Sequence, residues 1–341
     1  MDMNSVSTTD EAPLAAPIQD PKYFFDDGDC MFLAEGVLFK LHKLFLCRRG
    51  DDEPLSVFCD MFSMPQGAAT EAQSANPIPV TDTAEDFRAL CWALYALPTE
   101  IQQQNDPGAD IPRLVAVAKM SHKYMLPSFE PWALRIIWLH CKPNKKLKGY
   151  LNDCPQHILV QTYEVADAGD HRDLCSLVEK QWLARLKTGE LSLRPVLDFG
   201  ERYNRRAFLG DAYYHQAMNM KSFVPTMDIS RVADFSQSNL TPAQMHNLLR
   251  GYCSVSLFWQ RLETSGVPHY PCPESHPCPE SHPEEWMSDG LGANRPLDIR
   301  TALQAIERYP TYGFDCGCRN LYIQELLSSI PDHFLGEEGT A

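Results

Sequence analysis

The first strong pattern in the chain is an alternation of apolar and polar positions over residues 24–47. Apolar runs at 30–34 and 37–41 are separated only by Glu35-Gly36, which is typical of two strands joined by a tight turn. His42 follows directly and begins a segment with the spacing of a first helical turn. The pattern favours a structural hydrogen-bonding histidine over a ligand or a base, because no second catalytic group accompanies it.

Helical spacing dominates after this hairpin. Ser56 has the position of an N-cap for a short helix, and two prolines in residues 77–80 place a brief strand at a sheet edge. The next helix has Thr83 or Asp82 as its cap and is ended by Pro98, and the polar residues that follow predict a loop. The helices expected in this part are 57–62, 84–97, 111–124 and 129–141.

The remainder of the chain shows helical patterns and no strand-rich segment. The fold class predicted is α+β, with a small sheet and helical hairpins first and an all-α region after it. The helices expected here are 156–167, 170–187, 192–202, 205–219, 242–262, 296–308 and 318–330. The predicted divisions are a disordered tail over 1–21, an α+β domain over 22–141, a helical region over 142–262, a loop rich in Pro, Cys and His over 263–295, and C-terminal helices over 296–336.

Composition and charge narrow the classes of function. The chain has 341 residues, 44% hydrophobic and 22% charged, as expected of a globular protein. A formal charge of −15 disfavours binding to nucleic acid and to anionic membranes, since both require surplus Lys and Arg. No apolar stretch is long enough to span a membrane, and the acidic, Pro-rich start is unlike a signal peptide. A cytoplasmic or nuclear location is therefore expected, with the twelve cysteines as thiols or metal ligands.

A set of residues in the first 140 positions occurs in the order and spacing of a known family. The set is Asp29, Phe39, His42, Ser56, Val57, Phe58, Met61, Phe62, Phe87, Leu90, Leu94, Tyr95, Ala118, Lys123, Tyr124 and Leu134. The segment resembles a BTB/POZ domain, and it is most similar to the large group of fungal BTB proteins with a helical C-terminal region. The resemblance implies a non-catalytic adaptor or scaffold that binds other proteins, with self-association as a further expectation. It places the interaction surface near Asp29, His42, Phe58, Met61 and Phe62.

Two departures from the family pattern limit what the resemblance implies. Residues 1–22 contain three prolines and no helical stripe, which argues against obligate dimerisation through an N-terminal helix. The sequence SMPQGAATEAQS after the Met-Phe helix offers no match to the motif with which some relatives recruit cullin-type ubiquitin ligases. A cullin-ligase substrate adaptor therefore stays an alternative function, as does a zinc-stabilised nuclear regulatory protein.

The zinc alternative rests on a tandem repeat of CPESHP within residues 270–283. Thiolates and imidazoles are the preferred ligands of zinc, and Cys272 and His276 of the repeat could join Cys316 and Cys318 in a tetrahedral site. Against this, the spacings differ from those of zinc knuckles, and the many prolines favour an extended loop. The prediction is a loop, with a structural zinc as the competing hypothesis and no other cofactor.

An enzyme is not expected. The chain has no phosphate-binding glycine motif, no nucleophile elbow and no His-Glu-x-x-His metal motif. The acidic groups at Asp26-Asp27 and at Glu164, Asp167 and Asp170 are typical of solvated faces. No catalytic residue and no small-molecule substrate are therefore predicted.

Overall fold

The computed structural model describes residues 16–47, 55–63, 76–143, 149–219, 239–265 and 317–336, apart from the side chains of 259–265, 317–323 and 326. Within these residues the chain is α+β, with one small sheet and a majority of helix. It divides into two compact units, Met1–Val178 and Glu179–Ala341, which are described separately below.

The sheet of the N-terminal unit has four strands in the order β1-β3-β2-β4. Strands β2 (Cys30–Ala34) and β3 (Val37–Leu41) form the predicted antiparallel hairpin. Glu35 and Gly36 both have positive φ values, 47° and 80°, as a type I′ turn requires. Strand β4 (Ile78–Val80) pairs with β2 in parallel at one edge, which confirms the edge position predicted from its prolines.

The opposite edge strand, β1 (Ile18–Phe24), was not predicted, and it begins inside the segment 1–21 assigned to a disordered tail. That boundary is wrong by a few residues because β1 gains its stability from distant partners. It pairs in parallel with β3, and its Asp20 is buried against Arg88, with 2.6 Å between the carboxylate and the guanidinium. The Asp20 carboxylate also accepts the backbone N–H groups of Lys22 and Tyr23. Pro21 is tolerated because an edge strand leaves backbone positions unpaired.

The helices of the N-terminal unit follow the predicted pattern closely. They are α1 (Lys43–Leu46), α2 (Val57–Ser63), α3 (Ala84–Tyr95), α4 (Pro98–Gln103), α5 (Ile111–Lys123), α6 (Glu130–Cys141), the 3₁₀ turn η2 (Tyr150–Asn152) and α7 (Gln156–Ala168). Thr83 is the N-cap of α3, accepting the N–H of Asp86 at 3.1 Å, as predicted. Helix α4 was expected to be loop; it forms because Glu100 accepts the backbone N–H of Leu97 and satisfies its first turn.

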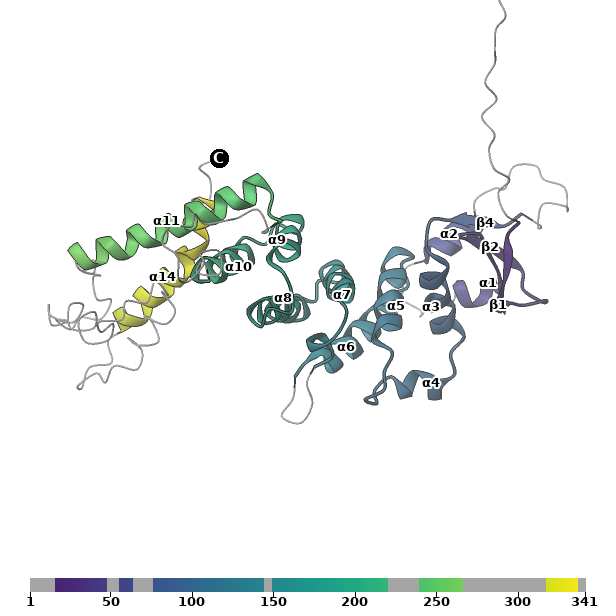
Figure 1. Cartoon of the computed structure of the whole chain (residues 1–341). Coiled ribbons are helices and arrows are strands. Elements are labelled where there is room, and N and C mark those ends of the chain that lie inside the picture. The colour runs from purple at the N-terminus through teal and green to yellow at the C-terminus, as the bar shows by residue number, and fades with distance from the viewer. Residues whose placement is uncertain are drawn as a thin grey trace, which may run out of the picture. The chain divides into compact units, whose positions relative to one another are not determined.

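An aromatic core joins the sheet to α3. Phe32, Phe39 and Phe87 are fully buried, and the ring of Phe87 lies 4.8 Å from that of Phe39 and 5.4 Å from that of Phe32. Helices α3 and α5 lie side by side (Figure 1). Helix α7 packs against α5, so it belongs to this unit, and the domain boundary predicted at 141–142 is too early.

The described part of the C-terminal unit contains only helices. The division between the units falls within α8 (Arg172–Lys187), and α9 (Leu193–Arg202), α10 (Arg206–Met218), α11 (Pro242–Ser265) and α14 (Gly317–Leu335) follow. All five lie where helices were predicted, although α11 extends to Ser265 and α14 runs five residues further than expected. Trp182 is fully buried and stacks on Phe199 at 5.1 Å. The predicted helix 296–308 and nearly all of the predicted loop 263–295 lie outside the described residues.

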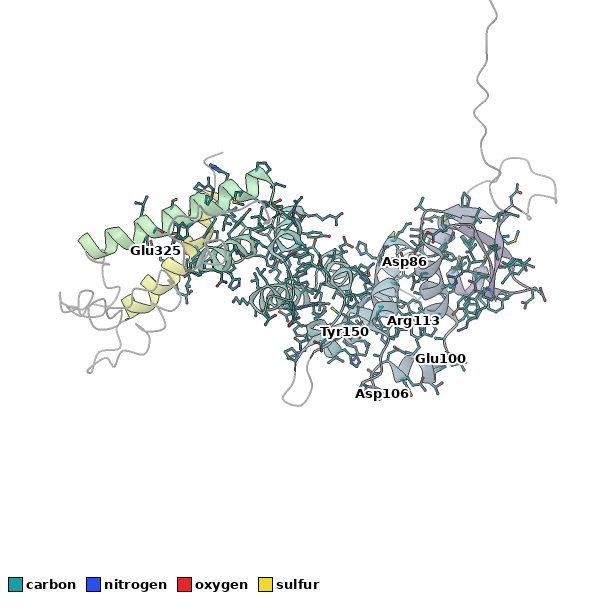
Figure 2. All side chains as sticks on the ribbon, viewed as in Figure 1. Asp86, Glu100, Asp106, Arg113, Tyr150 and Glu325 are labelled. Atoms are coloured by element: carbon teal, nitrogen blue, oxygen red, sulfur yellow. The ribbon has the colours of Figure 1, made fainter. Side chains whose placement is uncertain are left out.

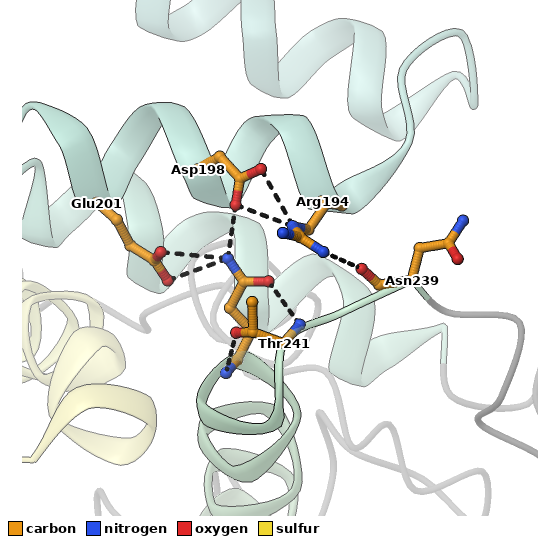
Figure 3. A network of polar contacts seen from close by, with 6 residues as sticks. Arg194, Asp198, Glu201, Asn239 and Thr241 are labelled. Atoms are coloured by element: carbon orange, nitrogen blue, oxygen red, sulfur yellow. Dashed lines mark hydrogen bonds and ion pairs between the residues drawn. The ribbon is translucent and has the colours of Figure 1, made fainter. Parts of the chain in front are cut away.

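A polar network attaches the start of α11 to α9 (Figure 3). Thr241 and Gln244 form a reciprocal capping box, in which each side chain accepts the backbone N–H of the other at 3.1 Å. The amide nitrogen of the buried Gln244 then donates to Asp198 at 2.9 Å and to Glu201 at 3.2 Å. Arg194 binds the carboxylate of Asp198 from the other side at 3.1 Å. The network therefore holds the start of α11 against α9.

Candidate interaction surface

His42, at the join of β3 and α1, forms hydrogen bonds with residues of neighbouring segments. The backbone N–H of His42 donates to the hydroxyl of Tyr95 at 2.9 Å, and His42 Nδ1 lies 3.0 Å from the same hydroxyl. His42 Nε2 lies 3.3 Å from Oδ1 of Asp27. A neutral ring with its hydrogen on Nε2 satisfies both side-chain contacts, since Tyr95 can donate to Nδ1 while Nε2 donates to Asp27. These contacts are the kind expected of a structural histidine at the join of a strand and a helix.

Asp29 stabilises the same join from the preceding strand. Its Oδ1 accepts the backbone N–H of Lys43, the first residue of α1, at 2.7 Å. The carboxylate therefore satisfies one of the free N–H groups at the start of this short helix. Burial raises the pKa of Tyr95 to about 12, so the hydroxyl that binds His42 keeps its proton in alkaline solution where a free tyrosine loses it.

Phe58 of α2 is a core residue, and its assignment to the interaction surface is corrected here. Its side chain is 0% exposed, because the ring stacks on Tyr124 at 4.3 Å and meets the edge of Phe32 at 5.5 Å. Met61 and Phe62, one helical turn further along α2, are half-buried and stay accessible. The ammonium group of Lys43 lies 5.2 Å from the centre of the Phe62 ring.

Large apolar side chains are exposed around α2. Leu44 is 75% exposed, Leu55 48% and Met125 51%, although residues of this type are usually buried. The three come from segments that meet at the start of α2. The hydroxyl of Ser56 donates to the carbonyl of Leu46 at 2.8 Å, and the N–H of Val57 donates to the carbonyl of Tyr124 at 3.1 Å. We call the group Leu44, Leu55, Met61, Phe62 and Met125 the α2 surface.

A buried polar cluster, which sequence reasoning missed, holds Met125 in place. Asp82 lies at the turn between β4 and α3. It accepts a hydrogen bond from the hydroxyl of Tyr124 at 2.5 Å and forms an ion pair with Lys123 at 2.7 Å. Burial, together with the hydrogen bond and charge of Asp82, raises the pKa of Tyr124. Asp82 was predicted only as a possible helix cap, since nothing local in the sequence indicates a partner forty residues away.

A cleft of the N-terminal unit has a volume of about 900 Å³ and is lined mainly by α3, α5 and α7. Two ion pairs lie in its lining: Asp86 with Lys119 at 2.7 Å, and Asp110 with Arg113 at 2.9 Å. Asp86 and Arg113 are labelled in Figure 2. The guanidinium of Arg113 also lies 5.1 Å from the centre of the Trp92 ring. These pairs are typical of solvated helix faces, and none of them joins a nucleophile to a base.

The proposed zinc ligands lie almost wholly outside the described residues. Cys272, His276 and Cys316 are not among them, and Cys318 lies in α14 at a position whose side chain is not described. Within the part of the chain that the structure describes, no three His, Cys, Asp or Glu side chains lie close enough to hold a metal ion. The zinc hypothesis therefore stays a prediction.

Comparisons of the whole chain with protein-family models, with curated proteins and with solved structures found no match. Among the helices that the structure describes, none combines the length and the apolar character that a membrane crossing needs.

Proposed function

We propose that the chain is a non-catalytic adaptor or scaffold whose N-terminal unit is a BTB/POZ-like domain that binds other proteins through the α2 surface. The observation that carries the proposal is the exposure of Leu44, Leu55 and Met125 beside the half-buried Met61 and Phe62. Exposed apolar groups of this kind are typical of sites that bind proteins.

The use of the polar residues supports the same proposal. His42 and Asp29 bind Tyr95 and the start of α1, and Asp82 binds Lys123 and Tyr124. Side chains that could otherwise act as bases or ligands are thus engaged in holding the helices around α2. Hydrogen bonds of this kind pre-organise the segments that carry the α2 surface, which lowers the cost of binding a partner.

The sequence resemblance provides the second line of support. The elements follow the order expected for a BTB-like domain: two strands joined by a turn, two short helices, an edge strand and then helical pairs. An additional parallel strand, β1, extends the sheet beyond the hairpin. The proposal for the fold family rests on this order of elements together with the residues that carry the resemblance.

The test compares proteins that co-purify with the intact chain and with a Leu44→Glu, Leu55→Glu variant. Charge at these exposed positions should leave folding intact and abolish capture of specific partners. Leu139→Glu is the matched control, since Leu139 is 52% exposed on α6 of the same unit. Partners that persist in the double variant, or that the control also loses, would refute a role for the α2 surface.

A further inference from the structure

Helix α14 packs against both α10 and α11 (Figure 1). We call the site of this packing the α10–α11 groove and define it by residues of the two helices that contact the segment from Ile330 to Gly336. These residues are Arg206, Gly210, Tyr213, Arg250, Gly251 and Ser254.

The groove has a slot shaped for one aromatic ring. Phe334 is 0% exposed, and its ring lies parallel to that of Tyr213, with an interplanar angle of 8° and centroids 5.8 Å apart. A Cβ atom on Gly251 would lie only 1.8 Å from Cδ1 of Phe334, and one on Gly210 would lie 2.7 Å from Cγ of Pro331. Glycine inside a helix is destabilising relative to alanine. The two glycines therefore make α10 and α11 less stable as helices, but they leave the space that α14 occupies.

Two arginines bind the carbonyl end of α14. Arg206 pairs with Asp332 at 2.5 Å and also donates to the carbonyl of Gly336, while Arg250 Nε donates to the carbonyl of Phe334 at 3.1 Å. The last carbonyls of a helix have no partner within the helix and carry partial negative charge, which guanidinium groups complement. The groove therefore recognises a helix C-terminus as well as the aromatic side chain near it.

The covalent connection does not determine which copy of α14 fills this groove. Residues 266–316 separate the end of α11 from the start of α14, and 51 residues have a contour length of roughly 170 Å. Every contact described above is available equally to the same segment of another molecule.

We propose that the α10–α11 groove is a docking site for the end of α14 and that a second copy of the chain can supply this segment. Exchange of an identical element is a route to self-association that needs no new surface. In one molecule the tether raises the effective concentration of its own α14, so exchange is expected at high protein concentration. The proposal is independent of the function assigned to the N-terminal unit.

The first test uses two full-length variants with complementary defects. Gly251→Leu fills the slot and leaves α14 without its groove, whereas Phe334→Ala leaves the groove without its anchor. Mixed together, the two should form a one-to-one complex by light scattering, while each alone stays at a lower mass. Phe334→Ala mixed with a Gly251→Leu, Phe334→Ala double variant is the control and should form no complex, which separates this association from any through the N-terminal unit.

The second test measures a labelled peptide of residues 317–341 against the full-length Phe334→Ala chain by fluorescence anisotropy. The same peptide carrying Phe334→Ala should bind more weakly by roughly a hundredfold to a thousandfold, as loss of a buried phenylalanine predicts. If a variant proves unfolded by circular dichroism, incorporation of excess peptide into the unsubstituted chain, followed by native mass spectrometry, decides the question. Failure of folded variants to associate, or failure of the peptide to enter the chain, would overturn the proposal.

Discussion

The hydroxyl of Tyr124 donates to Oδ2 of Asp82 across 2.5 Å, in a site where the Asp82 side chain is only 5% exposed. The bond connects the end of α5 to the turn before α3, two segments that are 42 residues apart in sequence. Lys123 neutralises the carboxylate from its other oxygen. This cluster holds in place the backbone that presents Met125, so the proposed surface depends on a buried polar contact beneath it.

Removal of this contact should destabilise the N-terminal unit without changing its packing. Tyr124→Phe keeps the ring stacked on Phe58 but leaves an oxygen of the buried Asp82 without its donor, which should lower the free energy of unfolding by about 1–3 kcal/mol. Urea denaturation followed by fluorescence measures the change. Asp106→Asn, at an exposed position labelled in Figure 2, is the matched control and should change stability by less than about 0.5 kcal/mol. Equal effects of the two substitutions would contradict a structural role for the Tyr124 hydroxyl.

Stability should decline in alkaline solution in two steps. Burial raises the pKa values of Cys30 and Cys141 from 9.0 to about 12, and that of Tyr95 from 10.0 to about 12. Above pH 9 the unfolded chain loses thiol protons that the folded chain keeps, and above pH 10 it loses tyrosine protons as well. The free energy of unfolding should therefore be constant with respect to these groups below pH 9 and fall between pH 9 and 12.

One substitution shows how much of the alkaline decline in the free energy of unfolding comes from Tyr95. Urea titrations at a series of pH values give the change of the free energy of unfolding with pH. Tyrosinate absorbance gives the protonation of the tyrosines in the folded state. In Tyr95→Phe the decline above pH 10 should be shallower, while the part that begins near pH 9 should persist. A stability that stays level to pH 12 in the unsubstituted chain would show that these groups are accessible to solvent.

Local signals in the sequence were sufficient for many of the elements. The hairpin turn at Glu35-Gly36, the Thr83 cap and the N-cap at Ser56 each depend on residues within four positions of one another, and each is present. Helix spacing likewise located α5 to α11, because one apolar face repeats over several turns.

Contacts between distant segments were the ones that sequence reasoning could not supply. Strand β1 depends on pairing with β3 and on the Asp20–Arg88 ion pair, whose members are 68 positions apart. Phe58 was placed on the surface by the family resemblance, and a helix of only seven residues does not itself reveal which of its aromatic residues faces the core. Gly210 and Gly251 gave no signal at all, since an isolated glycine in a helical pattern indicates nothing about what packs against it.

The Gln244 network should determine how firmly α11 is attached. Gln244→Ala removes the capping interaction with Thr241 and leaves Asp198 and Glu201 without their shared donor. Amide hydrogen exchange in the first turn of α11 should become faster by about tenfold, the equivalent of roughly 1.4 kcal/mol. His246→Ala, an exposed substitution on the same helix, should leave the exchange rate unchanged. Unaltered protection in Gln244→Ala would mean that α11 is held by its apolar contacts alone.

His42 and Tyr95 offer the most direct test of whether the histidine is structural. Tyr95→Phe keeps the ring contacts with Phe25 and Phe45 but removes the hydroxyl that binds both the backbone and Nδ1 of His42. In a double-mutant cycle with His42→Ala, the two substitutions should be non-additive by about 0.5–1.5 kcal/mol in the free energy of unfolding. The same cycle with Asp106→Asn, which shares no hydrogen bond with His42 in the described structure, should be additive. Additivity in the Tyr95 cycle would contradict a structural role for the contact between His42 and the Tyr95 hydroxyl.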